Sequence, residues 1–155
     1  MNFSGEKTAT FDEKGRVVLP ADYKNGMGGS VPGGELAIEL DPYEKCINIY
    51  PMEEWEKRLD FTRKKLNVND REQSRILDLF YRRFKILQVP PTNRLNFPSS
   101  FLEKVGIVKE VVFTGQGERI RLWDVKAYDD YIESMGDYSL SFAGIFGGSE
   151  NTENS

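Results

Sequence analysis

Alternating apolar and polar positions mark short β-strands in the first fifty residues. Residues 7–11 and 16–19 flank the polar stretch DEKG, which predicts a β-hairpin with Gly15 at a position that needs a positive φ. Residues 35–40 and 45–50 predict a second strand pair across DPYEK, because the Asp-Pro start of that stretch favours a turn. The first third of the chain is therefore expected to be mainly β.

The apolar period lengthens to three or four residues after Pro51, which is typical of helices. Pro51 stands where a helix N-terminus tolerates proline, so a first helix is expected to begin there. The polar residues 67–70 end it, and Asp70 is the expected N-cap of a second helix. An apolar stripe on the second helix predicts packing on a sheet, with the arginines of that helix in solvent. The stripe consists of Ile76, Leu77, Phe80, Tyr81 and Phe84.

The second half of the chain repeats the first. Residues 86–102 match residues 8–24 when Arg94 is set against Arg16, and the later strands match as well. A repeat of this length indicates that the folding unit is half of the chain. It predicts four further strands, at residues 85–90, 94–97, 109–115 and 118–123.

The second copy also predicts two helices. A short one is expected over 99–107, with Ser99 or Ser100 as its cap, and a longer one over 125–135. The sequence after this helix shows no period, and the last nine residues, 147–155, predict a disordered acidic and polar tail.

Each copy therefore consists of two strands, a short helix, two strands and a helix, so the predicted fold class is α+β, mainly β. Roughly 45 residues per copy lie near the lower limit for a self-sufficient core, so the copies are expected to need each other or a partner chain. Two copies related by a pseudo-twofold axis would share strands and close a small β-barrel without exposed edges. The expected domains are residues 5–51 (first repeat), 52–84 (helical linker), 85–128 (second repeat) and 129–155 (helix end and tail).

The composition removes most catalytic and metal-binding chemistry. The chain has no histidine and a single cysteine, Cys46, which excludes Ser-His-Asp and Cys-His triads and the usual zinc sites. The remaining polar residues form no recognisable catalytic set, so an enzyme is not expected and no cofactor is implied. Cys46 lies in an apolar strand pattern and is expected to be a buried, inert thiol in a reducing compartment. No signal peptide or membrane-spanning run is predicted.

Charge is segregated along the chain. The net charge is −4, but residues 57–85 carry ten basic and four acidic residues, whereas residues 129–155 carry six acidic residues and no Lys or Arg. An acidic chain of this kind can still present a basic face. The basic residues of 57–85 allow two interpretations, a second surface for phosphate or ordinary solvated helix faces, and the solvated faces are favoured.

The first turn and its flanks resemble a known family. Residues 11–20, FDEKGRVVLP, are similar to the D-x-K-G-R-hydrophobic-x-hydrophobic-P signature of MraZ proteins. The similarity extends to residues 3–6 (FSGE), 49–55 (IYPMEEW), 82–84 (RRF) and 119–124 (RIRLWD). It therefore covers most of the chain.

This resemblance implies a bacterial transcriptional regulator, a repressor of the division and cell-wall gene cluster, built from two AbrB-like swapped-hairpin units. It implies binding of double-stranded DNA at short direct repeats upstream of its own operon by a ring-like homo-oligomer. The implied location is the cytoplasm, in association with the nucleoid, with no membrane partner and no small-molecule substrate.

The family's D-x-x-x-R motif, carried over to this chain, places Asp12, Lys14, Gly15 and Arg16 at the DNA. A bidentate arginine on a guanine edge is the commonest specific base contact, and Lys14 is suited to a phosphate. The alternative is purely structural: Asp12 and Arg16 bridge their own turn, and Gly15 serves only the turn geometry.

The matching stretch of the second repeat, residues 90–94 (PPTNR), adds Thr92, Asn93 and Arg94 to the expected DNA contacts. Asn93 takes the place of Gly15, and asparagine tolerates the left-handed conformation, so the turn is expected to survive. Thr92 replaces a lysine, which predicts a weaker contribution from this loop.

A second function class is an AbrB-like protein-interaction module of antitoxin type that acts through its C-terminal segment. Its basis is the apolar stretch 138–146, YSLSFAGIF, which lacks a clear secondary-structure period. Docking of this stretch on a neighbouring subunit is the alternative. Trp55 and Trp123 are expected to be core or subunit-contact anchors, and Pro20 and Pro98 to end strands.

Overall fold

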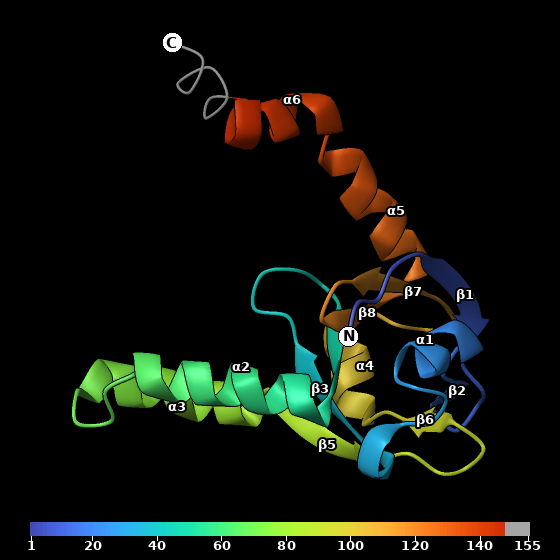
Figure 1. The fold of residues 1–155 in the computed structure, drawn as a ribbon, viewed down its shortest axis with the longest axis horizontal. Helices are drawn as coiled ribbons and strands as arrows, with labels where there is room; N and C mark the ends of the chain where they lie inside the picture. The colour runs from blue at the N-terminus through green and yellow to red at the C-terminus, as the bar shows by residue number, and fades with distance from the viewer. Residues whose placement is uncertain (148–155) are drawn as a thin grey trace. The chain divides into compact units, whose positions relative to one another are not determined.

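The computed structural model describes residues 1–147, which fall into two compact units, Met1–Val125 and the segment that begins at Lys126. The first unit holds the described strands: β1 (Glu6–Thr10), β2 (Arg16–Val18), β3 (Glu35–Leu40), β4 (Ile47–Pro51), β5 (Phe84–Gln88), β6 (Arg94–Asn96), β7 (Glu110–Gln116) and β8 (Arg119–Asp124). Its helices are α1 (Ala21–Gly26), η1 (Pro32–Gly34), α2 (Met52–Lys65), α3 (Arg71–Arg82) and α4 (Ser99–Lys104) (Figure 1). The later helices are α5 (Val125–Ser134), α6 (Tyr138–Phe142) and η2 (Ala143–Gly147). The predicted α+β, mainly β class is confirmed.

The strands form two antiparallel sheets. A six-stranded sheet has the order β1-β7-β8-β4-β3-β5, and β2 and β6 form a separate two-stranded ribbon. The predicted strand pairs β3–β4 and β7–β8 are confirmed. The predicted hairpin of β1 with β2 is wrong, because β1 pairs with β7 and β2 pairs with β6. The turn between β1 and β2 carries the chain from one sheet to the other instead of returning it along the same sheet.

The strand pairings repeat themselves when the two copies of the sequence are exchanged. In the ribbon, Val17 pairs with its counterpart Leu95, and in the large sheet Asn48 pairs with its counterpart Arg121. The first strand of each copy pairs with the third strand of the other copy, β1 with β7 and β5 with β3. The two copies therefore contribute to both sheets, as the small size of each copy predicted. A single closed barrel and the swapped-hairpin type of unit stay predictions.

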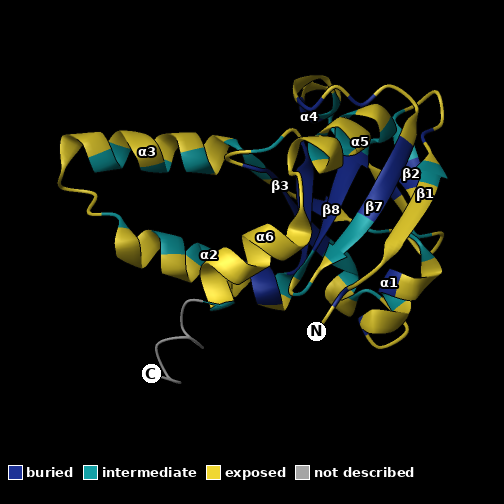
Figure 2. Ribbon diagram, turned by 90° about the horizontal axis from the view of Figure 1, so that it is seen from above, coloured by how far each residue is buried: buried dark blue, intermediate teal, exposed yellow. Residues whose placement is uncertain are grey.

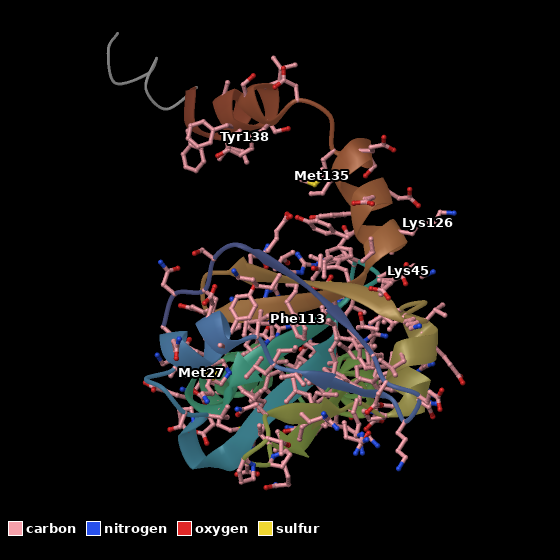
Figure 3. All side chains as sticks on the ribbon, turned by 90° about the vertical axis from the view of Figure 1, so that its right-hand side faces the viewer. Met27, Lys45, Phe113, Lys126, Met135 and Tyr138 are labelled. Atoms are coloured by element: carbon pink, nitrogen blue, oxygen red, sulfur yellow. The ribbon has the colours of Figure 1, made fainter. Side chains whose placement is uncertain are left out.

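The core lies between the large sheet and the ribbon. Val17 and Leu95 of the ribbon belong to one cluster of buried side chains with Phe113 of β7. Figure 3 shows Phe113 within the dense packing of side chains in this unit. Cys46 is buried as predicted, and burial raises the pKa of its thiol to about 11, so the reactive thiolate is disfavoured.

Helices α2 and α3 project from the large sheet (Figure 1). Trp55 of α2 and Phe80 of α3 contact the ring of Phe84 on the edge strand β5. The rings of Trp55 and Phe80 stack with their centroids 5.9 Å apart, and the centroids of the Trp55 and Phe84 rings lie 4.6 Å apart. Only this end of the predicted stripe packs on the sheet. Ile76 and Tyr81 of the stripe are 48% and 44% exposed, so the expectation that the whole stripe is covered by a sheet is wrong. Figure 2 shows α3 in the exposed and intermediate colours. The sheet is too narrow to reach the far turns of a helix that points away from it.

A buried ion pair holds α2 to the sheet. Arg58 of α2 donates from Nε and Nη2 to the carboxylate of Glu39 on β3, at 2.8–3.1 Å. Glu39 is only 2% exposed, so the loss of Arg58 would leave a buried carboxylate without its charged partner.

Both tryptophans, Trp55 and Trp123, are buried, as expected for residues of the core.

The helix starts confirm some expectations and correct others. Pro51 precedes α2, and Asp70 holds the N-cap position of α3, where its carbonyl rather than its side chain accepts from Ser74 N at 2.8 Å. Neither Ser99 nor a later serine caps α4, because Pro98 occupies the N-cap position. Pro20 has the same position before α1, so both prolines end a strand and begin a helix.

The segment that begins at Lys126 is helical in its described part. Residues 138–146 lie in α6 and η2, although their sequence shows no clear secondary-structure period. Asp137 starts α6 because its carboxylate accepts from Ser139 N at 2.9 Å. The predicted tail, 147–155, lies outside the described residues except for Gly147. None of the helices in residues 1–147 combines the length and apolarity that crossing a membrane requires.

Replacing Gly115 by alanine is expected to destabilise the first unit. An added Cβ would clash with the backbone of Phe3 and Ser4, and overpacking of this kind costs about 1–3 kcal/mol. Urea denaturation of G115A measures the change in the free energy of unfolding. G144A is the matched control, because nothing lies within 4 Å of its added Cβ. Equal stability of G115A and wild type would contradict the close contact.

Candidate nucleic-acid interface

The loop between β1 and β2 is closed by its own aspartate. Asp12 Oδ1 accepts from the backbone N–H groups of Lys14 and Arg16, both at 2.9 Å. Asp12 Oδ2 accepts from Arg16 Nε at 2.8 Å, and the backbone N–H of Asp12 donates to Arg16 O at 2.8 Å. The bridge between Asp12 and Arg16 that the structural alternative expects is therefore present.

The same contacts set the protonation state of Asp12. The hydrogen bond from the Arg16 backbone, helped by the Arg16 guanidinium and the Lys14 backbone, lowers the pKa of the Asp12 carboxyl despite some desolvation. The carboxylate is thus held in its charged form. Within residues 1–147 the terminal guanidinium nitrogens of Arg16 have no hydrogen-bond partner, so these donors stay available.

Gly15 does more than close the loop. Its φ is +76°, a left-handed conformation that other residues rarely adopt. Its carbonyl accepts from Phe97 N at 3.2 Å, which ties the first loop to the end of β6 in the second repeat.

The second loop reproduces this arrangement without the aspartate. Asn93 has a φ of 58°, the one positive φ outside glycine among residues 1–147, so the expected survival of the turn is confirmed. Its N–H donates to Pro90 O at 2.8 Å, and its carbonyl accepts from Leu19 N at 2.8 Å. Each loop is therefore anchored to the strand end that follows the other loop.

The two loops place their arginines on one face of the ribbon. Arg16 pairs with Asn96, and Val18 pairs with Arg94. Side chains directly opposite each other in an antiparallel pair share a face, and successive residues alternate between faces. Val17 and its partner face the core, so Arg16 and Arg94 both point outward. Arg94, unlike Arg16, has no carboxylate in its loop to orient it.

The ribbon face includes two residues that sequence reasoning did not select. Val18 is 48% exposed and Asn96 is exposed, although both lie on strands. The alternation of Val17 and Leu95 with their neighbours carries this signal, but it can be interpreted only when the pairing of β2 with β6 is known.

The basic residues of the linker divide into two groups. Arg58 pairs with Glu39, and Arg83 Nη2 donates to the carbonyl of Asp41 at 2.9 Å, so these two have internal structural roles. Others lie on exposed helix faces, such as Lys64, which is paired with Asp60 at 2.8 Å. These contacts favour the solvated interpretation.

The sequence comparisons decide the family. The model of the family described as "MraZ protein, putative antitoxin-like" matches residues 2–79 and 91–143. The chain belongs to the MraZ family. A protein named transcriptional regulator MraZ from Nitratidesulfovibrio vulgaris is 30% identical over 134 residues, which cover 85% of this chain and 87% of that protein. One of the same name from Nitrosomonas europaea is 31% identical over 141 residues, covering 88% and 90%.

Membership of the MraZ family gives the class of function. The relatives carry the name of transcriptional regulators, and a further one from Xanthomonas campestris is 30% identical over 132 residues. Transcriptional regulation is therefore the function class of this MraZ chain, and it is not an enzyme class. The matched ranges include both loops of the ribbon.

The Asp12 carboxyl is expected to titrate below its ordinary value of 3.8. Because its folded pKa is lower than its unfolded pKa, it stabilises the loop above the unfolded value, and this contribution is lost as the pH falls through the folded value. NMR shifts of the Lys14 and Arg16 backbone amides measure the midpoint as the solution is acidified. D12N is the control in which this titration should vanish. A midpoint at or above 3.8 would contradict the loop geometry.

Proposed function

We propose that this MraZ protein is a sequence-specific DNA-binding regulator that represses the division and cell-wall gene cluster. It binds short direct repeats upstream of its own operon as a ring-like homo-oligomer, in the cytoplasm and in association with the nucleoid. The observation that carries the proposal is the outward arginine on the β2–β6 ribbon, held at Nε by Asp12 with its terminal nitrogens available. Interleaving of the two repeats supports units of the swapped-hairpin type.

Arg16 is the principal reading residue in this proposal. A guanine edge offers two acceptors to one guanidinium, and an arginine fixed in advance loses less side-chain freedom on binding. Asp12 does not itself contact the DNA in this proposal, because phosphate repels a carboxylate. Its role is to orient Arg16 through the hydrogen bond from Arg16 Nε. The ribbon suits this role, since the major groove admits a two-stranded β-ribbon.

The other loop residues supply positioning contacts. Lys14 is exposed at the loop tip and is suited to a phosphate, and Gly15 lets the backbone approach closely. Thr92 and Asn93 of the second loop offer polar groups for phosphate, and Arg94 provides a second, less constrained arginine. Such contacts fix the register of a protein on DNA, whereas contacts with base edges select the sequence.

Several weak loops can together overcome the unfavourable net charge. A chain with a net charge of −4 is not attracted to DNA as a whole. A ring that presents the same ribbon several times meets repeated DNA sites, and avidity raises the apparent affinity without new contacts. Because the contacts include phosphates, the affinity falls steeply with salt.

The second candidate, an interaction module of antitoxin type, rests on α6 and η2. Tyr138, Leu140 and Ile145 are each more than 70% exposed, and the ring centroids of Phe142 and Phe146 lie 4.6 Å apart with the rings tilted by 35°. A short helical segment with this many exposed apolar side chains favours a binding role. The wording of the family description, antitoxin-like, is compatible with a foreign protein as its partner.

Arg16→Ala is expected to weaken binding to a duplex from upstream of the operon by about 1–3 kcal/mol for each engaged ribbon. Lys14→Ala is expected to weaken binding evenly across sequences and to lower the salt slope by about one for each engaged loop. Fluorescence anisotropy measures both effects. R75A, which removes an exposed arginine of α3, is the matched control and should bind like wild type. Equal affinity of wild type for scrambled DNA, or of R16A for the natural duplex, would refute the proposal.

Deleting residues 136–155 separates the two roles of the C-terminal segment. We expect the mass of the oligomer, measured by light scattering, to fall after the deletion. The reason is that, in the intact oligomer, a neighbouring subunit covers the exposed apolar side chains of α6. Unchanged mass together with unchanged DNA binding would instead favour a foreign partner.

A further inference from the structure

We propose that the whole outward face of the β2–β6 ribbon reads the DNA, with Val18 and Asn96 as specificity-determining residues beside the two arginines. This inference rests on the proposed DNA binding and extends it from the loops to the strands. It names two residues that neither loop contains.

The register of the ribbon places each of these residues directly across from an arginine. Asn96 lies directly opposite Arg16, and Val18 lies directly opposite Arg94. All four side chains share the face that is turned away from the core, because Val17 between them is buried. An arginine that reaches a base edge from this face therefore brings its cross-strand neighbour to the same groove.

Val18 and Asn96 have the chemistry to contact base edges. An asparagine amide can make one bidentate contact with adenine, in which its NH₂ group donates to N7 and its oxygen accepts from the N6 amino group. Valine methyl groups suit the thymine methyl. Within residues 1–147 the Asn96 side chain has no hydrogen-bond partner, and Val18 is half exposed on a strand. Neither residue is needed by the core.

The two residues also make the reading face asymmetric. Val18 and Asn96 hold equivalent positions in the two repeats, as do Arg16 and Arg94. The ribbon backbone has a local twofold relation, but an apolar side chain stands on one side and an amide on the other. Such a face distinguishes the two directions along a duplex, which is what a site arranged as direct repeats requires. Two residues of strand span about 7 Å, or about two base-pair steps.

The test is selection of duplexes from a randomised library by the full-length protein, followed by affinity measurements on the selected site with each base pair changed. Asn96→Val is expected to lose discrimination at one A·T pair by on the order of tenfold, and Val18→Asn at a different pair. The matched controls make the same chemical changes at exposed positions in the turn between α2 and α3, N69V and V68N, and are expected to select the wild-type sequence. Circular dichroism melting verifies that all four variants fold.

The outcomes separate this inference from the proposed function. If wild type enriches no sequence, the proposed DNA-binding function fails and the inference fails with it. If wild type enriches a sequence and both ribbon variants select the same one with the same base preferences, the inference alone is overturned. A change confined to the ribbon variants supports it.

Discussion

Two backbone hydrogen bonds between the repeats hold the loops in place, and they depend on one unusual conformation. The carbonyls of Gly15 and Asn93 accept from Phe97 and Leu19, each in the other repeat. Both acceptors have a positive φ, which turns the carbonyl toward the opposite strand. Since β2 and β6 have only three residues each, these two bonds extend a short ribbon at both ends and join the loops to it.

This exchange gives the chain both its core and its functional face. The inner side of the ribbon, Val17 and Leu95, closes the core against the large sheet, so the outer side is held rigidly. A reading face built on such a support keeps its arginine in place before DNA binds, which reduces the entropy lost on binding. Asp12 adds the negative charge that holds Arg16, and the second repeat has no aspartate at the matching position. The two loops therefore have a similar backbone conformation but differ in electrostatics.

The sequence predicted most elements before residue 135 and the strand pairs within each repeat, but it did not predict the strand pairs between the repeats. Period and turn composition located the strands, the helices after Pro51 and the left-handed turn at Asn93, because these depend on neighbouring residues. The hairpin of β1 with β2 was wrong because strand pairing is decided by partners about 100 residues away, as in the pairing of Thr10 with Glu110. For the same reason the loops were predicted as site candidates, whereas Val18 and Asn96 were not: their shared face exists only once β2 lies beside β6.

The central claim is that DNA meets the ribbon rather than the basic helices of the linker. Hydrogen–deuterium exchange of the full-length protein, with and without a duplex from upstream of the operon, tests it most directly. The account predicts that DNA slows exchange in the loops and strands of residues 12–18 and 91–96 and leaves α2 and α3 unchanged. Protection confined to α2 and α3, with no change in the ribbon, would contradict it.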